Sequence, residues 1–222
     1  MTPFTRYAIY FTCPPGPLAE RGADWLGWDV ATGTARDQDA DLATLTETPR
    51  KYGFHGTLKP PMRLAEGRTA SELMAAARDL AARHTPFTID LGVTALGRFL
   101  ALTPVTPSDP LQTLASACVT ELDPFRAPPT EAELAKRRKA RLTPEQENNL
   151  VAWGYPYVHD AFRFHMTLTG PLDDAARQDA QSLATSHFAP ALTAPAPVDA
   201  ITLCGERPDG RFQEIERIVL SG

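Results

Sequence analysis

FHGTLKPPM (54–62) and FHMTLTGPL (164–172) are two copies of one pattern, half a chain apart in this 222-residue protein. The copies share Phe, His, Thr, Leu and Pro at equivalent positions. A pattern that recurs in both halves of a chain indicates a duplicated structural unit. We therefore expect these two stretches to occupy equivalent places in two related halves.

The segments after each copy predict one helix and two strands. An alanine-rich segment with apolar residues three and four apart follows each copy, at 69–84 and 173–188. Extended segments come next, within 87–105 in the first half and 198–220 in the second. The turn ERPDGRF (206–212) is typical of a hairpin. The sequence thus predicts two β-α-β-β units.

The segments outside the repeat add a strand and more helices. We expect the strand at 6–11 and helices at 17–27, 109–122 and 131–153, with Pro144 starting a second helix inside the last range. No flexible linker separates the halves. We therefore expect an α+β fold, a single bilobal domain over 1–222 with approximate halves 1–107 and 108–222. The repeat does not fix the pairing of strands, so strands exchanged between the lobes are compatible with it.

Strand geometry gives the repeated motif a chemical meaning. Alternate residues of a strand point the same way, so His55 shares a face with Thr57, and His165 shares a face with Thr167. An imidazole, with a usual pKa of about 6.5, can act as base or acid at neutral pH. One histidine can take a proton from water while the other gives one to a leaving oxygen. The hydroxyls can donate hydrogen bonds to phosphate oxygens, and this scheme needs no metal or cofactor.

Simpler interpretations compete with this one. A lone His-x-Thr is uninformative, and threonine is an ordinary strand former. His84 and His187 stand at the ends of predicted helices, where an imidazolium favours the helix dipole, and His159 has no patterned partner. A metal site built from His55, His165 and Asp160 lacks the usual ligand spacing. Repetition in equivalent places makes the two motif histidines the catalytic candidates.

The paired His-x-Thr-Leu motifs, FHGTL (54–58) and FHMTL (164–168), resemble the two-histidine (2H) phosphoesterase superfamily. That superfamily includes RNA 2′,3′-cyclic phosphodiesterases and 2′-5′ RNA-ligase-like proteins. The resemblance implies two pseudo-symmetric lobes, with antiparallel sheets lining a central cleft and helices outside. It implies that the motif histidines are acid and base and that the motif threonines bind phosphate, without a metal.

Four further segments, 6–11, 51–61, 123–128 and 153–172, resemble the superfamily branch associated with phosphonate-utilisation operons. This narrower resemblance implies a small cyclic phosphodiester in phosphonate catabolism, such as 5-phosphoribosyl 1,2-cyclic phosphate. It also points to candidate substrate-binding residues, with ordinary packing as the alternative for each tyrosine. These candidates are Tyr52, Lys59, Arg126, Tyr155 and Tyr157.

Charge and composition restrict the partners. The formal net charge of −5 argues against long nucleic acid and favours a small phosphorylated substrate. The basic run KRRKAR (136–141) is either a solvated helix face or a lid over a polyanionic substrate. No apolar run is long enough to span a membrane, no signal-peptide pattern is present, and the three cysteines are isolated. We expect a cytoplasmic protein without a membrane partner.

The leading hypothesis is a metal-independent cyclic phosphodiesterase that uses two-histidine acid/base catalysis. RNA processing, as a 2′,3′-cyclic phosphodiesterase or a 2′-5′ RNA-ligase-like protein, is the first alternative, and it needs an electropositive groove. The second alternative is a non-catalytic nucleotide- or phosphate-binding module. Turnover of a small cyclic phosphate separates the leading hypothesis from the second alternative, and the salt dependence of RNA binding separates it from the first.

Overall fold

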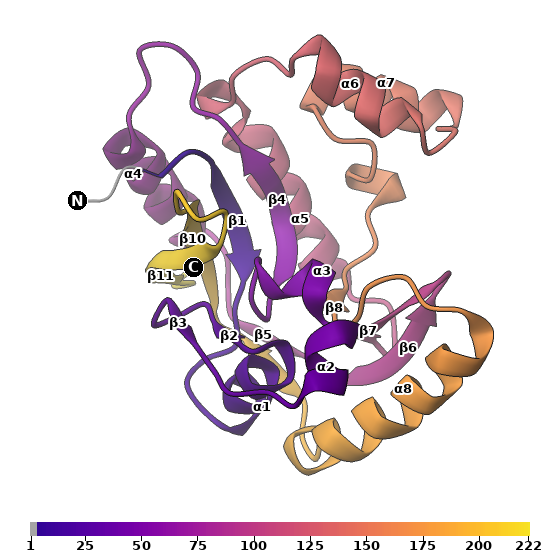
Figure 1. Ribbon diagram of the computed structural model, residues 1–222. Helices are drawn as coiled ribbons and strands as arrows, with labels where there is room; N and C mark the ends of the chain where they lie inside the picture. Colours follow the sequence, from indigo (N-terminus) through magenta and orange to yellow (C-terminus); the bar gives the residue numbers. More distant parts are fainter. Residues whose placement is uncertain (1–3) are drawn as a thin grey trace.

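The computed structural model describes residues 4–222, and its centre is a seven-stranded sheet with antiparallel neighbours (Figure 1). The strand order is β11-β10-β1-β4-β8-β7-β6, and two small sheets pair β2 with β3 and β5 with β9. The strands are β1 (Tyr7–Phe11), β2 (Trp28–Asp29), β3 (Thr34–Ala35), β4 (Gly56–Met62), β5 (Phe87–Ile89), β6 (Leu91–Leu96), β7 (Phe99–Pro104), β8 (Met166–Thr167), β9 (Ala196–Val198), β10 (Ala200–Glu206) and β11 (Phe212–Val219).

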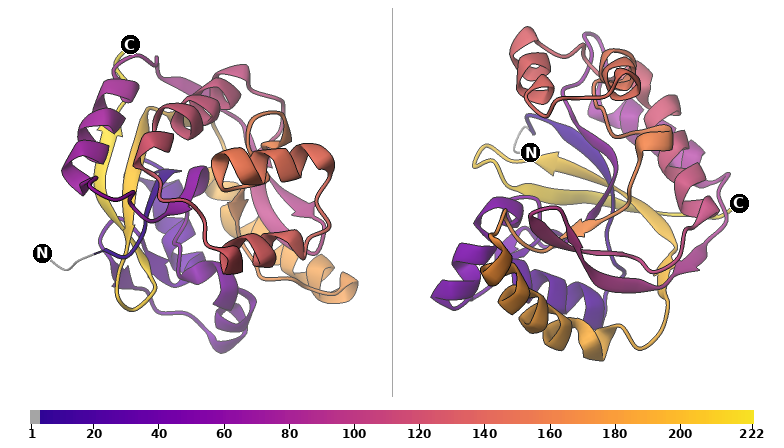
Figure 2. Two further views of the ribbon diagram at one scale, coloured as in Figure 1. Left: turned by 90° about the horizontal axis from the view of Figure 1, so that it is seen from above. Right: turned by 90° about the vertical axis from the view of Figure 1, so that its right-hand side faces the viewer.

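The helices cover the outside of this sheet, which confirms the predicted α+β class. They are α1 (Pro17–Leu26), α2 (Ala40–Leu45), α3 (Glu47–Arg50), α4 (Ala70–Ala81), α5 (Asp109–Glu121), α6 (Glu131–Arg138), α7 (Pro144–Trp153) and α8 (Asp174–Phe188), with 3-10 turns η1 (Asp123–Phe125), η2 (His159–Ala161) and η3 (Ala189–Ala191). Helix α5 packs on β4, α4 on β10, and α8 on β6 and β7. Helices α6 and α7 lie apart from the others, at the top of Figure 1 and of the right-hand view in Figure 2.

Each motif strand lies on the same side of the sheet as the hairpin that follows the other motif copy along the chain. Strand β4, in the first copy, connects through β1 to the β10–β11 hairpin, which follows the second copy along the chain. Strand β8, in the second copy, pairs with β7 of the β6–β7 hairpin, which follows the first copy. Each side of the sheet is therefore assembled from both halves of the sequence.

The two sides of the sheet meet at one residue pair, Gly56 opposite Met166. Beyond this pair β4 carries Pro60 and Pro61, neither of which has an N–H to donate to a neighbouring strand. The approach of the strands also needs a glycine, because a Cβ on Gly56 would lie 2.3 Å from ring atoms of Phe164. The strands consequently touch at one point and then diverge.

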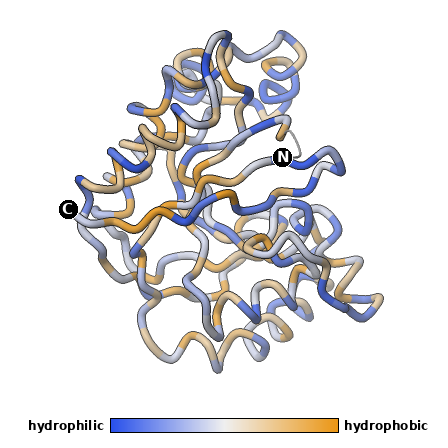
Figure 3. Tube along the Cα trace, turned by 90° about the vertical axis from the view of Figure 1, so that its left-hand side faces the viewer, coloured by the Kyte–Doolittle hydropathy of each residue, from blue (hydrophilic) through white to orange (hydrophobic). Residues whose placement is uncertain are grey.

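The face of each motif opposite its histidine and threonine is buried. Phe54 and Leu58 from the first copy and Phe164, Met166 and Leu168 from the second join the main hydrophobic core. Figure 3 shows that hydrophilic and hydrophobic residues also alternate along the turns of the helices. The histidines and threonines of both motifs are half-buried, as expected for the opposite face.

Some expected elements differ from the structure. The second motif forms a strand of only two residues, and both motif histidines stand immediately before their strands. The segment 87–96 is split at Asp90 into β5 and β6, which join different sheets. Pro144 starts α7 as predicted. Within residues 4–222, no helix has the length and apolar character that crossing a membrane requires.

Candidate active site

The pairing of Gly56 with Met166 brings the four motif side chains together. Because the two strands are antiparallel, this register sets His55 opposite Thr167 and Thr57 opposite His165. Side chains directly opposite on one face of an antiparallel pair have Cβ atoms roughly 4.5–5.5 Å apart. The two histidines and two threonines therefore form one polar patch, with the histidines on a diagonal.

Backbone carbonyls set the tautomer of both histidines in the same way. Nδ1 of His55 lies 2.9 Å from the oxygen of Gly53, and Nδ1 of His165 lies 2.7 Å from the oxygen of Arg163. A carbonyl can only accept a hydrogen bond, so Nδ1 carries a proton in each ring. Nε2 of a neutral ring is then the acceptor, and Nε2 of His55 lies 3.2 Å from Oγ1 of Thr57, whose hydroxyl donates.

His55 is enclosed by aromatic rings. The ring centroid of Tyr10 lies 3.8 Å from that of His55, at an interplanar angle of 31°, and Tyr52 lies 5.9 Å away. The pKa of His55 is lowered to about 4, chiefly by burial and to a smaller extent by the nearby charge of His165, while the hydrogen bond to Gly53 opposes both. His55 is therefore neutral at pH 7, with a lone pair on Nε2.

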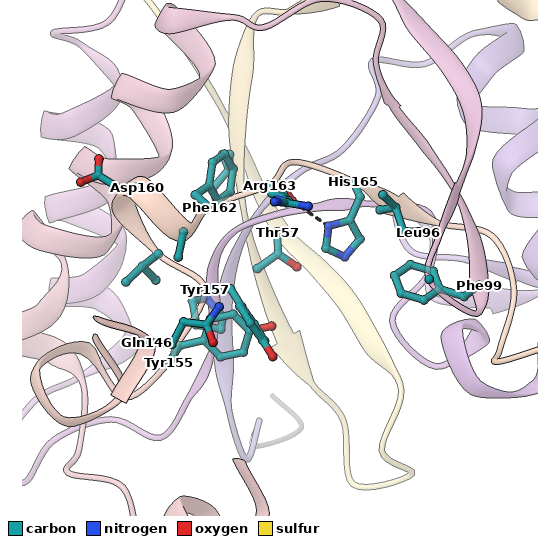
Figure 4. A pocket seen from close by; sticks show the side chains of 15 residues that line it. Thr57, Leu96, Phe99, Gln146, Tyr155, Tyr157, Asp160, Phe162, Arg163 and His165 are labelled. Carbon is teal, nitrogen blue, oxygen red and sulfur yellow. Dashed lines mark hydrogen bonds between the residues drawn. The ribbon is translucent and has the colours of Figure 1, made fainter. Parts of the chain in front are cut away.

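A pocket of about 520 Å³ opens beside this patch, where the two sides of the sheet diverge. Figure 4 shows Thr57 in its middle, His165 with Leu96 and Phe99 on one side, and Gln146 with two tyrosines on the other. The pocket is lined by Thr57, Leu58, Pro60, Leu96, Gly97, Phe99, Gln146, Tyr155, Tyr157, Val158, Asp160, Ala161, Phe162, Arg163 and His165. Its wall combines apolar side chains with several polar and charged ones, which could orient a small polar ligand.

The three candidate tyrosines lie at or near this pocket. Tyr155 and Tyr157 line it and pack edge to face, with ring centroids 5.6 Å apart. Burial raises the pKa of Tyr155, so its hydroxyl stays protonated. Tyr52 lies on the other side of the patch, between His55 and Phe212.

Lys59, by contrast, does not reach the pocket. Between β1 and β4 the register advances one residue on β1, from Ile9 to Tyr10, and two on β4, from Lys59 to Thr57. This bulge breaks the alternation, so Leu58 and Lys59 are both buried. The lysine ammonium donates to the carbonyl of Val119 at 2.8 Å, and burial lowers the pKa of Lys59 to about 8.

Arg126 also lies outside the pocket wall, where it joins two segments. Its guanidinium donates to both carboxylate oxygens of Asp123, at 2.7 and 3.1 Å, and to the carbonyl of Ala152 at 3.0 Å. Oδ1 of Asp123 also lies 3.4 Å from Nζ of Lys59. The chain Lys59–Asp123–Arg126 thus connects β4 to the C-terminus of α7, immediately before the two pocket tyrosines.

Tyr10, Phe99 and Gln146 were not predicted as site residues. Tyr10 becomes a neighbour of His55 only through the pairing of β1 with β4, and Phe99 reaches His165 only through the exchanged hairpin. No sequence pattern specifies either pairing. Across residues 4–222, no three His, Cys, Asp or Glu side chains are grouped so that they could hold a metal ion.

Comparison with known proteins shows which family the chain resembles. The family described as "Protein of unknown function (DUF1045)" matches residues 57–213. "Ribose 1,5-bisphosphate phosphokinase PhnN" of Janthinobacterium sp. (strain Marseille) is 42% identical over 232 residues, and the protein of the same name from Laribacter hongkongensis (strain HLHK9) is 33% identical over 224. The alignments cover 98% and 96% of the chain, which spans about half, 51%, of the length of each relative.

Solved structures with a similar arrangement include E. coli LigT complexed with NADP+. The two chains are 17% identical, with a TM-score of 0.46, and the match covers 99% of each.

Proposed function

The chain belongs to the DUF1045 family, and we propose that it is a metal-independent phosphoesterase that hydrolyses a small cyclic phosphodiester. The observation that carries this proposal is the register of Gly56 with Met166, which gathers both His-x-Thr pairs on one face. Two imidazoles and two hydroxyls beside a pocket of about 520 Å³ suit one phosphate group with a small attached body.

In the proposed reaction His55 is the general base. Its ring is neutral at pH 7 because its pKa is lowered to about 4, and its Nδ1 proton is engaged by Gly53. Nε2 of His55 takes a proton from water as the water oxygen forms a bond to phosphorus. Thr57, displaced from its resting contact with Nε2, donates to a non-bridging phosphate oxygen together with Thr167.

His165 is the proposed general acid. With Nδ1 held by the Arg163 carbonyl, a proton on Nε2 is available to the oxygen that leaves as the cyclic P–O bond breaks. The products are a phosphomonoester and a hydroxyl group, formed by the addition of one water. After the reaction His55 carries an extra proton and His165 lacks one. His55 then loses its proton to solvent and His165 takes one up, which restores the starting states.

The names of the two relatives support a ribose phosphate as the attached body. Each is named for a reaction on ribose 1,5-bisphosphate, and the chain spans about half of each. Hydrolysis of 5-phosphoribosyl 1,2-cyclic phosphate at the O2–P bond yields that compound. The proposed substrate of the chain is therefore this cyclic phosphate, whose product would be the substrate named for the relatives.

Phosphorus NMR tests the proposal directly. The purified chain, with EDTA present, is incubated with 5-phosphoribosyl 1,2-cyclic phosphate and with nucleoside 2′,3′-cyclic phosphates. We expect the ribose cyclic phosphate signal to be replaced by that of a phosphomonoester at C1. No conversion of any cyclic phosphate, or conversion that EDTA abolishes and zinc restores, would contradict it.

RNA 2′,3′-cyclic phosphodiesterase or ligase-like activity is the second candidate, favoured by the basic run at 136–141. The net charge of −5 weighs against it. RNA held in a basic groove should dissociate steeply as salt rises, because each neutralised phosphate releases counterions. Tight, strongly salt-dependent binding of an oligonucleotide would favour this candidate over the small substrate.

A further inference from the structure

The hairpin of α6 and α7 contributes little to the hydrophobic core. No residue of α6 is buried, and α7 buries only Leu150. Both helices begin with a capping box, at Thr130 and Thr143, so local hydrogen bonds stabilise their ends. Figure 1 and the right-hand view of Figure 2 show the hairpin away from the sheet. We call residues 131–153 the cap, and its Gln146 lines the pocket.

One basic residue of the cap lies against the pocket wall. The guanidinium carbon of Arg137 is 4.6 Å from the ring centroid of Tyr155, which lines the pocket. Its neighbour Arg138 is paired with Glu147 at 2.7 Å. Arg137 has no carboxylate within 4.0 Å among residues 4–222, so its charge is not neutralised by the protein.

The aromatic contact prepares this guanidinium for an anion. A guanidinium over an aromatic ring is held by cation–π attraction, and the N–H groups that the ring does not engage can bind an anion. Phosphate accepts two parallel hydrogen bonds from such an edge. Burial raises the pKa of Tyr155 more than the neighbouring Arg137 lowers it, so the supporting ring stays neutral.

The position of Arg137 separates it from the reacting phosphate. Figure 4 shows Tyr155 and Tyr157 on the side of the pocket opposite His165, with Thr57 between. The charged residues that line the pocket itself are Arg163, beside His165, and Asp160. An anion at Arg137 would thus belong to the distal part of a ligand whose cyclic phosphate lies at Thr57 and His165.

We propose that Arg137, supported by Tyr155, binds a second, non-reacting phosphate of the substrate. The inference rests on the proposed phosphoesterase function and defines its substrate class as small sugars that carry a phosphomonoester in addition to the cyclic phosphate. In this proposal the cap helps to select the substrate, because it supplies the arginine that binds the second phosphate.

The test compares Arg137→Gln with Lys139→Gln, which removes the same charge from the exposed end of α6. Each is measured on ribose 1,2-cyclic phosphate with and without a 5-phosphate. We expect Arg137→Gln to lower kcat/KM about 10- to 100-fold for the 5-phosphorylated substrate, the range of a charge-assisted hydrogen bond, and less than about threefold for the other. Lys139→Gln should change both by less than about threefold.

Equal losses on both substrates, equal losses in both variants, or no loss would overturn the assignment of Arg137. A wild-type chain that hydrolyses neither substrate would instead overturn the proposed function. In that case, calorimetric titration with ribose 5-phosphate decides on Arg137: binding weakened by Arg137→Gln and not by Lys139→Gln supports the phosphate site, and any other pattern contradicts it.

Discussion

The two His-x-Thr motifs have the same key residues and different surroundings. His55 precedes a seven-residue strand and packs against Tyr10 with ring centroids 3.8 Å apart. His165 precedes a strand of two residues, and its aromatic neighbour Phe99 is 5.8 Å away. Burial lowers the pKa of His55 to about 4. Duplication thus supplies two equal imidazoles, and their neighbours make them unequal, as a base and an acid need to be.

The largest effect should come from removing either imidazole. His55→Ala and His165→Ala should each lower kcat on a cyclic phosphate by about 10²–10⁴-fold, the usual contribution of one general acid or base. The rates are followed by phosphorus NMR, with circular dichroism to check the fold. His84→Ala, outside the pocket wall, should keep the wild-type rate. Two histidine variants with near wild-type rates would end the two-histidine account.

The dry setting of His55 should also appear in the pH dependence of stability. Between pH 6.5 and about 4 the unfolded chain protonates His55 while the folded chain resists it, so stability falls as pH falls. The loss should be on the order of 3 kcal/mol below pH 4, from the size of the pKa shift. Urea denaturation across this range should give a flatter pH profile for His55→Gln. Parallel profiles for wild type and variant would refute the pKa assigned to His55.

The two threonines should differ in their effect on catalysis. Thr57 contacts His55 and lines the pocket, whereas Thr167 is not part of the pocket wall. Thr57→Val should lower kcat about 10- to 100-fold through the loss of a donor to the phosphate, and Thr167→Val less than about tenfold. The two matched variants are compared on one substrate. A larger loss for Thr167→Val would reverse the proposed placement of the phosphate.

The smallest predicted effect concerns the residue that follows each histidine, which differs between the two motifs. The first motif has Gly56 where the second has Met166, because the ring of Phe164 fills the space of a side chain at position 56. Gly56→Ala should destabilise the fold by about 1–3 kcal/mol, measured by urea unfolding. Gly92→Ala is the control, since its Cβ would meet only Val105 at 3.4 Å. Equal stabilities for the two variants would mean that the strands need no close approach.

The sequence predicted the parts of this site that depend on local patterns. Strand alternation correctly separated His55 and Thr57 from the buried Phe54 and Leu58. Lys59, which the narrower resemblance gave as a substrate-binding candidate, is buried away from the pocket, because a bulge next to it breaks the alternation of β4 and that bulge follows from pairing with β1. The α+β class followed from the repeat.

Long-range pairing accounts for what the sequence left open. Tyr10 lies beside His55 only because β1 pairs with β4, and Phe99 lies beside His165 only because β7 of the first half pairs with β8 of the second. Residues 28–50 form β2, β3, α2 and α3, and their sequence has no repeat and no clear periodicity of apolar residues. The packing of Trp28 and Val30 against Tyr10 arises from tertiary contact. Such contacts join residues far apart in sequence, which local periodicity does not encode.

The division of labour between the histidines is tested most directly with a leaving group that needs no proton. His55→Ala and His165→Ala are compared on a ribose cyclic phosphate and on a 4-nitrophenyl phosphodiester. If His165 is the acid, His165→Ala should recover to within about tenfold of wild type on the nitrophenyl ester, while His55→Ala keeps its full deficit. Recovery of His55→Ala alone, or equal deficits of both variants on both substrates, would contradict the account.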